Sequence, residues 1–332
     1  MKNKIIATLV AFGLVGSASA LDINENLSIN GFIDTSYTHN ENDGGGGNDE
    51  QHLGLDEIEL NFLFNVGGAS GAIHLDDTER NGDTDGGEES SVNVEQAFIG
   101  YTLESGASLT IGKYGSELGL EREDPGGLYT FSRAYSTDAV GNQFNLGDVD
   151  SHVYEGVTFG YNSDVFGLGI SLQNDASQRE DIEDNELDLE FSIAYTGIEN
   201  LTLGGGYRFD NQGTSVDEVD VLNVYFTTVM GKFLLGAEYI ELENGGGLAG
   251  AKTDQDLDGW QVIADYDVSE KLGVALRISS NELDGDNDYE KVTLAPNYSL
   301  TDSLGVILEY SDVDTGSGGD ANELALELTF TF

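Results

Sequence analysis

The sequence predicts an all-β protein, a sixteen-stranded antiparallel transmembrane β-barrel with a long constriction loop between its fifth and sixth strands. Three observations support this fold. Apolar residues recur at every second position in segments of about ten residues, connections alternate between short and long, and aromatic residues recur at matched ends of the segments. Strands of about this length and asymmetry are typical of barrels that cross a membrane.

The first twenty residues have the pattern of a secretory signal peptide. Lys2 and Lys4 precede an apolar run over 5–15, and small residues end at Ala20. The run is shorter than the roughly 20 residues that a membrane helix needs. We therefore expect a signal peptide at 1–20 and a single barrel domain at 21–332, with 332 − 20 = 312 residues.

Acidic residues dominate the composition. The chain has 13 Lys and Arg against 62 Asp and Glu, a formal charge of −49, and removal of Lys2 and Lys4 would leave 11 − 62 = −51. Such a charge excludes nucleic acid as a partner. The 15 Tyr and 15 Phe argue against a disordered acidic chain. Since there is no Cys, stability must come from packing and backbone hydrogen bonds.

The alternating segments number sixteen. An even count places both chain ends on one side, where the last strand can pair with the first and close the barrel. The segments are predicted at 27–38, 55–66, 70–76, 91–103, 107–113, 153–161, 166–173, 187–196, 201–209, 219–228, 232–242, 259–267, 271–279, 288–298, 303–311 and 322–332.

The connections form two classes. Those after even-numbered strands are short, as at 67–69, 104–106, 197–200 and 267–270. Those after odd-numbered strands are longer and rich in Gly, Asp and Asn, as at 39–54, 77–90, 174–186, 243–258 and 312–321. Short periplasmic turns and long external loops have this arrangement.

Outward-facing aromatic residues gather at the ends of the even-numbered strands, and a sparser set lies near the other end. Amphipathic rings favour the membrane interfaces. A soluble β-sandwich shares the short-strand pattern but does not explain aromatics at matched depth. The first set is Phe64, Tyr101, Tyr161, Tyr195, Phe226, Tyr266, Tyr298 and Phe332, and the second is Tyr37, Tyr207, Tyr239 and Tyr310.

Two residues depart from the pattern. Pro296 lies inside the fourteenth strand, where its missing N–H breaks a ladder bond unless a bulge is present. Glu95 shares the outward parity of Ala97 and Ile99, and a carboxylate facing lipid is costly. Either this strand slips register at a bulge or its upper half faces protein, as at a subunit contact, and we favour the subunit contact.

One connection, at 114–152, is far longer than the others. Loops of this length without strand pattern usually have a function. Leu118, Leu120, Tyr129, Phe131 and Tyr135 give it apolar surface for docking. A loop that projects outward as a receptor-binding element is the alternative, but the apolar content favours one that folds into the barrel and narrows it.

The sequence resembles a known family at this point. The run VNVEQAFIGYTLESGASLTIGKYGSELGLERE, followed by YTFSRAYS and EGVTFGY, and the final Phe332 resemble the general porins of Gram-negative outer membranes, most closely the β-barrel porin type of that superfamily. The resemblance implies a homotrimer of water-filled barrels in the cell outer membrane, among lipids and lipopolysaccharide. It also implies passive passage of small hydrophilic solutes.

In general porins, acids on the folded loop face basic residues on the wall, which creates a transverse field. By position, the resemblance assigns the loop charges to Glu117, Glu121, Arg122, Glu123, Asp124 and Arg133. The candidate basic wall residues, by inward parity, are Lys113, Arg208, Arg277 and Lys291. The sequence departs from the family because no strand carries the closely spaced arginines of the usual basic ladder.

The remaining inward positions are strongly acidic. Carboxylates around a pore favour cations and repel anions, so we expect a moderate preference for cations that salt screening weakens. The predicted acidic wall residues are Asp34, Glu57, Glu59, Glu155, Asp188, Glu190, Glu238, Asp265, Glu309, Glu323 and Glu327.

Catalysis and tight metal binding are not expected. A barrel hydrolase needs a nucleophile with a positioned base, and no nucleophile elbow accompanies His39, His52, His74 and His152. The acidic runs 83–89 and 284–290 do not match an EF-hand loop. We expect no cofactor, and at most weak Ca²⁺ or Mg²⁺ bridging at the external loops, where solvated surface charge is the simpler interpretation.

Three interpretations of the pore remain at the level of sequence. A general diffusion channel is favoured because inward aromatics are few, chiefly Phe32, Phe98 and Tyr225. A channel specific for a sugar or another small solute would instead line its lumen with aromatic side chains. A plugged structural barrel or adhesin would conduct no ions.

Overall fold

The computed structural model describes residues 20–42, 49–78, 92–121, 127–135, 153–174, 187–210, 219–244, 256–283, 287–314 and 319–332. Within these residues no helix has the length and apolar character needed to cross a membrane. The strands are β1 (Leu21–Asn24), β2 (Leu27–Asn42), β3 (Glu50–Val66), β4 (Ala69–Thr78), β5 (Asn93–Thr102), β6 (Ala107–Gly115), β7 (Val153–Asn162), β8 (Phe166–Asn174), β9 (Leu187–Ile198), β10 (Leu201–Phe209), β11 (Val221–Met230), β12 (Phe233–Leu242), β13 (Leu257–Asp267), β14 (Leu272–Leu283), β15 (Asn287–Ser299), β16 (Leu304–Asp314) and β17 (Asp320–Thr331).

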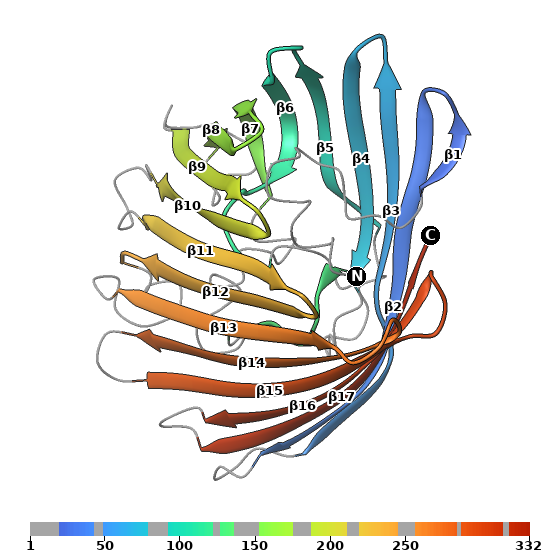
Figure 1. The fold of residues 1–332 in the computed structure, drawn as a ribbon, viewed down its shortest axis with the longest axis vertical. Coiled ribbons are helices and arrows are strands. Elements are labelled where there is room, and N and C mark those ends of the chain that lie inside the picture. The colour runs from blue at the N-terminus through green and yellow to red at the C-terminus, as the bar shows by residue number, and fades with distance from the viewer. Residues whose placement is uncertain are drawn as a thin grey trace.

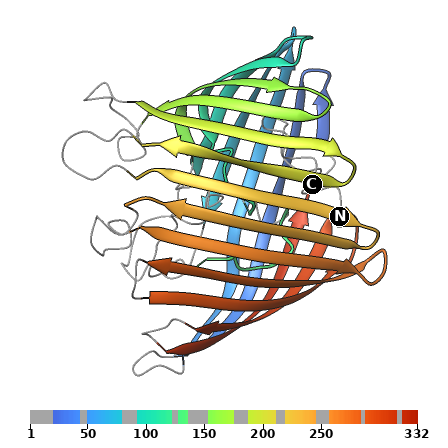
Figure 2. The same ribbon diagram turned by 60° about the vertical axis from the view of Figure 1, so that its left-hand side comes forward.

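Strands β2 to β17 form a closed antiparallel barrel. Each strand pairs with the next along the chain, and β17 pairs with β2 in a register that joins Leu326 to Tyr37. Figures 1 and 2 show the strands side by side around a common interior. The sixteen predicted strands and their closure are thus confirmed, and closure leaves no open sheet edge.

The short strand β1 was not predicted. It pairs with the beginning of β2, with Leu21 opposite Ile29. The backbone of Phe332 exchanges two hydrogen bonds with Gly31, at 3.0 and 3.1 Å. Strand β1 therefore continues the pairing of β2 beyond the point where β17 ends, and four residues are too few to show an alternating pattern in the sequence.

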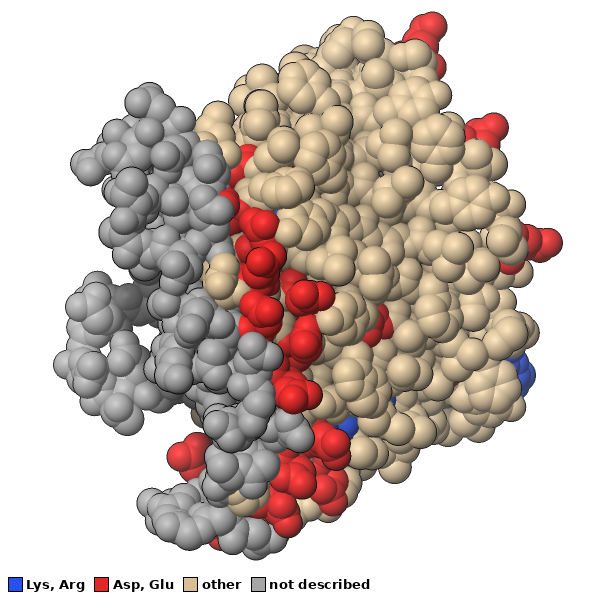
Figure 3. Space-filling view, turned by 90° about the vertical axis from the view of Figure 1, so that its left-hand side faces the viewer, with Lys and Arg blue, Asp and Glu red and all other residues tan. Residues whose placement is uncertain are grey.

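The two faces of each strand differ as the alternation predicts. In β9, the side chains of Phe191, Ile193 and Tyr195 are exposed on the outer surface, while Asp188, Glu190 and Ala194, at the alternate positions, are buried on the inner face. On the face drawn in Figure 3, Asp and Glu gather at one end, a few charged residues lie at the opposite edge, and the band between them is almost free of charge. Apolar side chains outside and polar side chains inside are the arrangement that a lipid environment requires.

The short connections are confirmed. The turn between β3 and β4 consists of Gly67 and Gly68, with φ of 62° and 87°, and a two-residue hairpin of this type needs positive φ at both positions. The connections between β9 and β10 and between β11 and β12 also have two residues. The long connections contain residues outside the described ranges.

The predicted outer aromatics near the turn end are exposed, from Phe64 at 37% to Tyr101 at 50%. They include Tyr161, Tyr195, Phe226, Tyr266 and Tyr298. The side chain of Phe332 is half-buried and stacks on Phe330, with ring centroids 6.0 Å apart. Aromatic rings therefore surround this end of the barrel at the level where a membrane interface would lie.

Both irregular residues have a local explanation. At Pro296 the register between β15 and β16 continues unchanged, from Leu294 opposite Tyr310 to Asn297 opposite Ile307, so the ladder is interrupted without a bulge. At Glu95 the register between β4 and β5 does shift, because Glu95 is the extra residue of a bulge. Its side chain is 5% exposed. The bulge accounts for Glu95 without the subunit contact that the sequence favoured.

Candidate functional site

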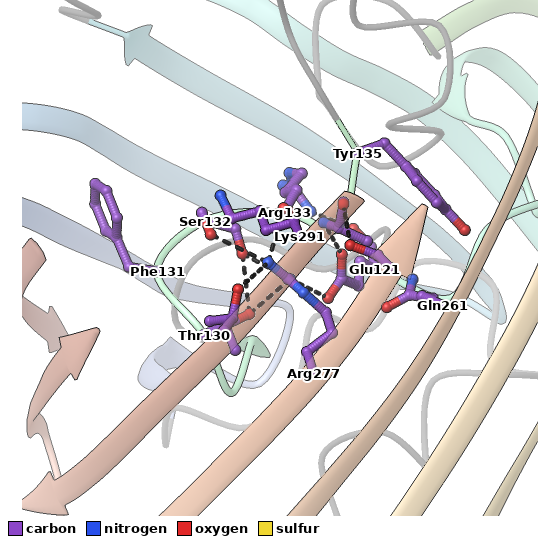
Figure 4. A network of polar contacts seen from close by, with 12 residues as sticks. Glu121, Thr130, Phe131, Ser132, Arg133, Tyr135, Gln261, Arg277 and Lys291 are labelled. Carbon is purple, nitrogen blue, oxygen red and sulfur yellow. Dashed lines mark hydrogen bonds and ion pairs between the residues drawn. The ribbon is translucent and has the colours of Figure 1, made fainter. Parts of the chain in front are cut away.

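The segment that follows β6 turns into the interior of the barrel. Its described residues, 116–121 and 127–135, form hydrogen bonds with side chains on the inner faces of β9, β11, β12, β14 and β16. The segment therefore lies along the inner wall from β9 to β16, and Figure 4 shows the part beside Arg277.

The first contact lies on β9, immediately after β6 ends. Glu190 accepts hydrogen bonds from the hydroxyl of Ser116, at 2.7 Å, and from the backbone N–H of Glu117, at 3.0 Å. The hydroxyl of Ser192 donates to the Glu117 carboxylate at 2.8 Å. Charge-assisted bonds of this kind are about twice as strong as neutral ones, so they fix where the segment leaves the wall.

Glu238 on β12 holds two distant parts of the segment together. Its carboxylate accepts from the backbone N–H of Leu120 at 2.6 Å and from the hydroxyl of Tyr135 at 3.2 Å. The amides of Asn223 and Gln261 also donate to it, each at 2.8 Å. Burial, together with the nearby Glu238 carboxylate, raises the pKa of Tyr135 well above its usual value, so its phenol remains a hydrogen-bond donor.

Arg277 on β14 is the centre of the network in Figure 4, and its side chain is fully buried. Its Nη1 donates to the carboxylate of Glu121 at 2.7 Å, to the hydroxyl of Thr130 at 2.9 Å and to the carbonyl of Ser132 at 2.7 Å. Its Nη2 donates to the carbonyl of Arg133 at 2.8 Å. The planar guanidinium can serve several acceptors at once, so one wall residue holds both described parts of the segment.

Glu309 on β16 binds the far part of the segment. It accepts from the backbone N–H of Phe131 at 2.8 Å and of Ser132 at 3.2 Å, and also from the hydroxyl of Ser132. The carbonyl of Ala134 accepts from the hydroxyl of Ser279 on β14. Backbone groups of the segment are thus satisfied by side chains of the wall, as buried backbone requires.

Apolar side chains of the segment also pack on the wall. Leu118 belongs to a buried cluster with Ile240, and Leu120 belongs to a second with Leu234. Gly236 lies on the inner face of β12, where an added Cβ would be 3.3 Å from the Leu120 side chain. A small residue at this position leaves room for the leucine. The apolar residues that the sequence predicts as a docking surface, among them Leu118 and Leu120, therefore pack against the barrel wall.

Ten of the eleven predicted wall acids lie on the inner face, because they alternate with lipid-facing apolar residues or are buried. These are Asp34, Glu57, Glu59, Asp188, Glu190, Glu238, Asp265, Glu309, Glu323 and Glu327. Of these, Glu57 and Glu323 are only half-buried.

Three of the four predicted basic residues also lie on the inner face, and each has an oxygen partner. Arg277 binds Glu121, as described above. Lys291 forms an ion pair with Glu323 at 2.5 Å. Arg208 donates to the hydroxyl of Tyr154 and lies over its ring, 5.2 Å from the centroid.

The predictions for Lys113 and Glu155 were wrong. These residues are paired across β6 and β7 and share the outer face with Ile111 and Phe159, which are 53% and 54% exposed. The Lys113 ammonium donates to the carbonyl of Val94 at 2.7 Å. Both residues lie near strand ends, where a charged side chain that faces lipid costs only about 0–1 kcal/mol. Their charges are therefore compatible with the outer face.

Only some of the predicted loop residues lie within the described part of the chain. Glu117, Glu121 and Arg133 belong to the described segment, where Arg133 donates to the carbonyl of Glu121. Arg122, Glu123 and Asp124 lie outside the described residues, as do the acidic run 83–89 and residues 284–286 of the run 284–290.

Sequence reasoning missed the neutral polar residues of the site. Ser116 is part of the segment and donates to Glu190, whereas Asn223, Gln261 and Ser279 on the wall bind the segment or orient the acid that binds it. Asn223, Gln261 and Ser279 could have been identified from their inward positions in the predicted strands. Ser116 lies outside any strand and gave no such signal. Selecting charged residues alone therefore left these contacts out.

The chain is similar to a known protein family in sequence and to solved structures in fold. Its sequence matches the Gram-negative porin family over residues 7–318. No curated protein matches it. Among solved structures, it is similar to an anion-selective porin from Comamonas acidovorans, with a TM-score of 0.67 and 14% identity over 92% of this chain and 99% of that one.

Two further structures have the same fold. OmpF of Salmonella typhi, solved with daunomycin, has a TM-score of 0.68 and 15% identity over 94% of this chain and 100% of that one. The trimer form of OmpT from Vibrio cholerae has a TM-score of 0.58 and 16% identity over 92% and 99%. At these identities the likeness shows the fold alone. With the family match over most of its length, the chain belongs to the Gram-negative porins, which are channels of the outer membrane.

Proposed function

We propose that the protein is a general diffusion porin that prefers cations and whose pore is narrowed by the segment after β6. The observation that carries this proposal is the balance of charge on the inner face. Ten predicted acids lie there, while the basic residues Arg277 and Lys291 are each held by a carboxylate. A net negative lining attracts cations and repels anions.

The fold does not decide the sign of this preference. A porin of similar fold from Comamonas acidovorans is anion-selective. Selectivity must therefore come from the side chains of each lumen. Here the partly exposed acids Glu57 and Glu323 face the lumen, together with Glu121, whose side chain is 12% exposed. Among the described residues, these carboxylates are candidates for contact with permeating ions, although Glu121 and Glu323 are paired with Arg277 and Lys291.

We further propose that the chain is exported by a signal peptide at 1–20 and assembles as a homotrimer. The trimer form of the similar OmpT structure supports the assembly. The outer aromatic residues support placement among lipids and lipopolysaccharide, with rings at the membrane interface.

Refolded protein in a planar bilayer under a KCl gradient tests the channel and its selectivity. We expect stable conductance, closure in three equal steps and a reversal potential of cationic sign. A reversal potential of anionic sign would overturn the selectivity. Folded protein without conductance would instead favour a structural barrel or adhesin.

A solute-specific channel is distinguished in the same bilayer. A specific solute, such as a sugar, would block the ion current at low concentration and saturably, because it occupies a binding site. A general porin shows only a gradual loss of current that is similar for solutes of equal size. Saturable block by one solute class would therefore contradict the general diffusion proposal.

A further inference from the structure

Three side chains that bind metals in other proteins meet on the inner face of β3, β4 and β5. They are Glu59, His74 and Glu95, with exposures of 1%, 2% and 5%. One ligand atom from each residue lies within 4.8 Å of the other two. The Nδ1 atom of His74 is 3.3 Å from Oε1 of Glu59. The three residues lie on β3, β4 and β5, whereas the hydrogen bonds described above for the segment after β6 come from β9 to β16.

The bulge in β5 brings the third residue into this group. The register places Asn61 opposite His74, and Glu59 is two positions along on the same face. Gln96 is opposite His74 on the other side, but the next pair joins Leu75 to Val94, so Glu95 is the extra residue. Without the bulge, Glu95 would share the outward parity of Ala97. Bulges often redirect a side chain next to a functional site.

A neighbouring side chain orients this carboxylate. The Gln96 amide donates to Oε1 of Glu95 at 3.0 Å, and its oxygen accepts from the backbone N–H of Gly115 at 3.3 Å. The ring of Phe98 lies 6.3 Å from that of His74. Such outer-shell bonds and apolar neighbours are typical of metal sites, where they fix the ligands before the ion arrives.

We propose that Glu59, His74 and Glu95 bind one divalent transition-metal ion, with Zn²⁺ as the favoured ion and water as its fourth ligand. Two carboxylates and a neutral imidazole balance a charge of 2+ in this buried site. In a tetrahedral zinc site with bonds near 2.1 Å, ligand atoms are about 3.4 Å apart. The distance of 3.3 Å between Oε1 of Glu59 and Nδ1 of His74 already fits this geometry. The carboxylate of Glu95 would have to move slightly closer to both atoms. Imidazole favours Zn²⁺ over Ca²⁺ and Mg²⁺, which prefer all-oxygen sites.

Calorimetric titration of folded protein in detergent with ZnCl₂ tests the site. We expect one Zn²⁺ per chain, and His74→Gln and Glu95→Gln should each weaken binding at least about tenfold. His39→Gln is the matched control, because His39 also lies beside a carboxylate, Glu41 at 3.1 Å, but outside the cluster. This variant should bind Zn²⁺ as the wild type does.

Two further measurements keep the test independent of folding defects. Gln96→Leu retains all three ligands but removes the bond that orients Glu95, together with the bond from Gly115, so we expect about tenfold weaker binding in a folded barrel. Zn²⁺ should also raise the unfolding temperature of the wild type and of His39→Gln, since an ion that binds only the folded state stabilises it. Absence of binding by the wild type, or unchanged binding by folded His74→Gln, would overturn the proposal. Either result leaves the channel function untouched.

Discussion

At the scale of single residues, the most informative side chain is Arg277. It is fully buried on the inner face and contacts the segment at Glu121, Thr130, Ser132 and Arg133. In a porin constriction, a wall arginine is expected to face the solute. Here both terminal nitrogens of its guanidinium donate to the protein itself. We therefore regard Arg277 as a structural anchor whose charge is compensated by Glu121.

Replacing this arginine should loosen the segment. In Arg277→Met, the carboxylate of Glu121 loses its partner, and breaking a buried ion pair costs about 3–5 kcal/mol. We expect a lower unfolding temperature in detergent and larger current noise in single-channel records. Lys291→Met is the control and should have a smaller effect, because its partner Glu323 is 31% exposed. Equal effects of the two substitutions would contradict the anchor role.

A matched pair of glutamates tests the assignment of faces. Glu57 lies on the inner face of β3, whereas Glu155 lies on the outer face of β7. We expect Glu57→Gln to reduce the cation preference, because it removes a charge from the lumen, and Glu155→Gln to leave it unchanged. Reversal potentials at low salt measure both. A larger shift for Glu155→Gln would mean that the face assignment is wrong.

The face of the sheet on which a strand residue lies could be predicted from the sequence. The prediction was correct where it followed the apolar residues of the same strand. Leu109 and Ile111 fix the outer face of β6, and Lys113 shares their parity. The prediction gave Lys113 inward parity, which the outward positions of Leu109 and Ile111 contradict. The inward direction of Glu95 was different, because it depends on a bulge that appears only when β4 and β5 are paired.

At the scale of elements, the segment after β6 combines polar and apolar contacts with the wall. Its backbone N–H groups bind Glu190, Glu238 and Glu309, and Leu118 and Leu120 fill buried clusters. Length and apolar content predicted that the segment docks. The identity of its partners was not predictable, because they come from strands separated from it by up to 178 residues.

Shortening this segment should widen the pore. Deletion of 121–130 removes part of the chain from the barrel interior, and we expect a larger conductance in 1 M KCl, where screening over about 3 Å minimises effects of the deleted charges. Deletion of 44–47, in a predicted external loop, is the control and should leave conductance nearly unchanged. If the first deletion leaves conductance at the wild-type value, the segment does not limit the pore.

At the scale of the whole molecule, closure of β17 on β2 makes one barrel with an apolar outer surface and a charged interior. Strand number, closure and turn lengths were predicted from period and spacing, because each strand has its own inner and outer pattern. The short β1 and the bulge were not, since both are defined by pairing with a neighbour. The net charge of the interior is a property of all strands together, and the preference for cations depends on it.

The reversal potential of the wild-type channel, measured at a fixed KCl ratio but at two mean concentrations, tests this account most directly. The electrostatic screening length is about 10 Å at 0.1 M and about 3 Å at 1 M. We therefore predict a reversal potential of cationic sign that is large in dilute salt and falls towards zero in concentrated salt. A reversal potential of anionic sign, or one that stays at zero in dilute salt, would contradict the claim that inner carboxylates govern permeation.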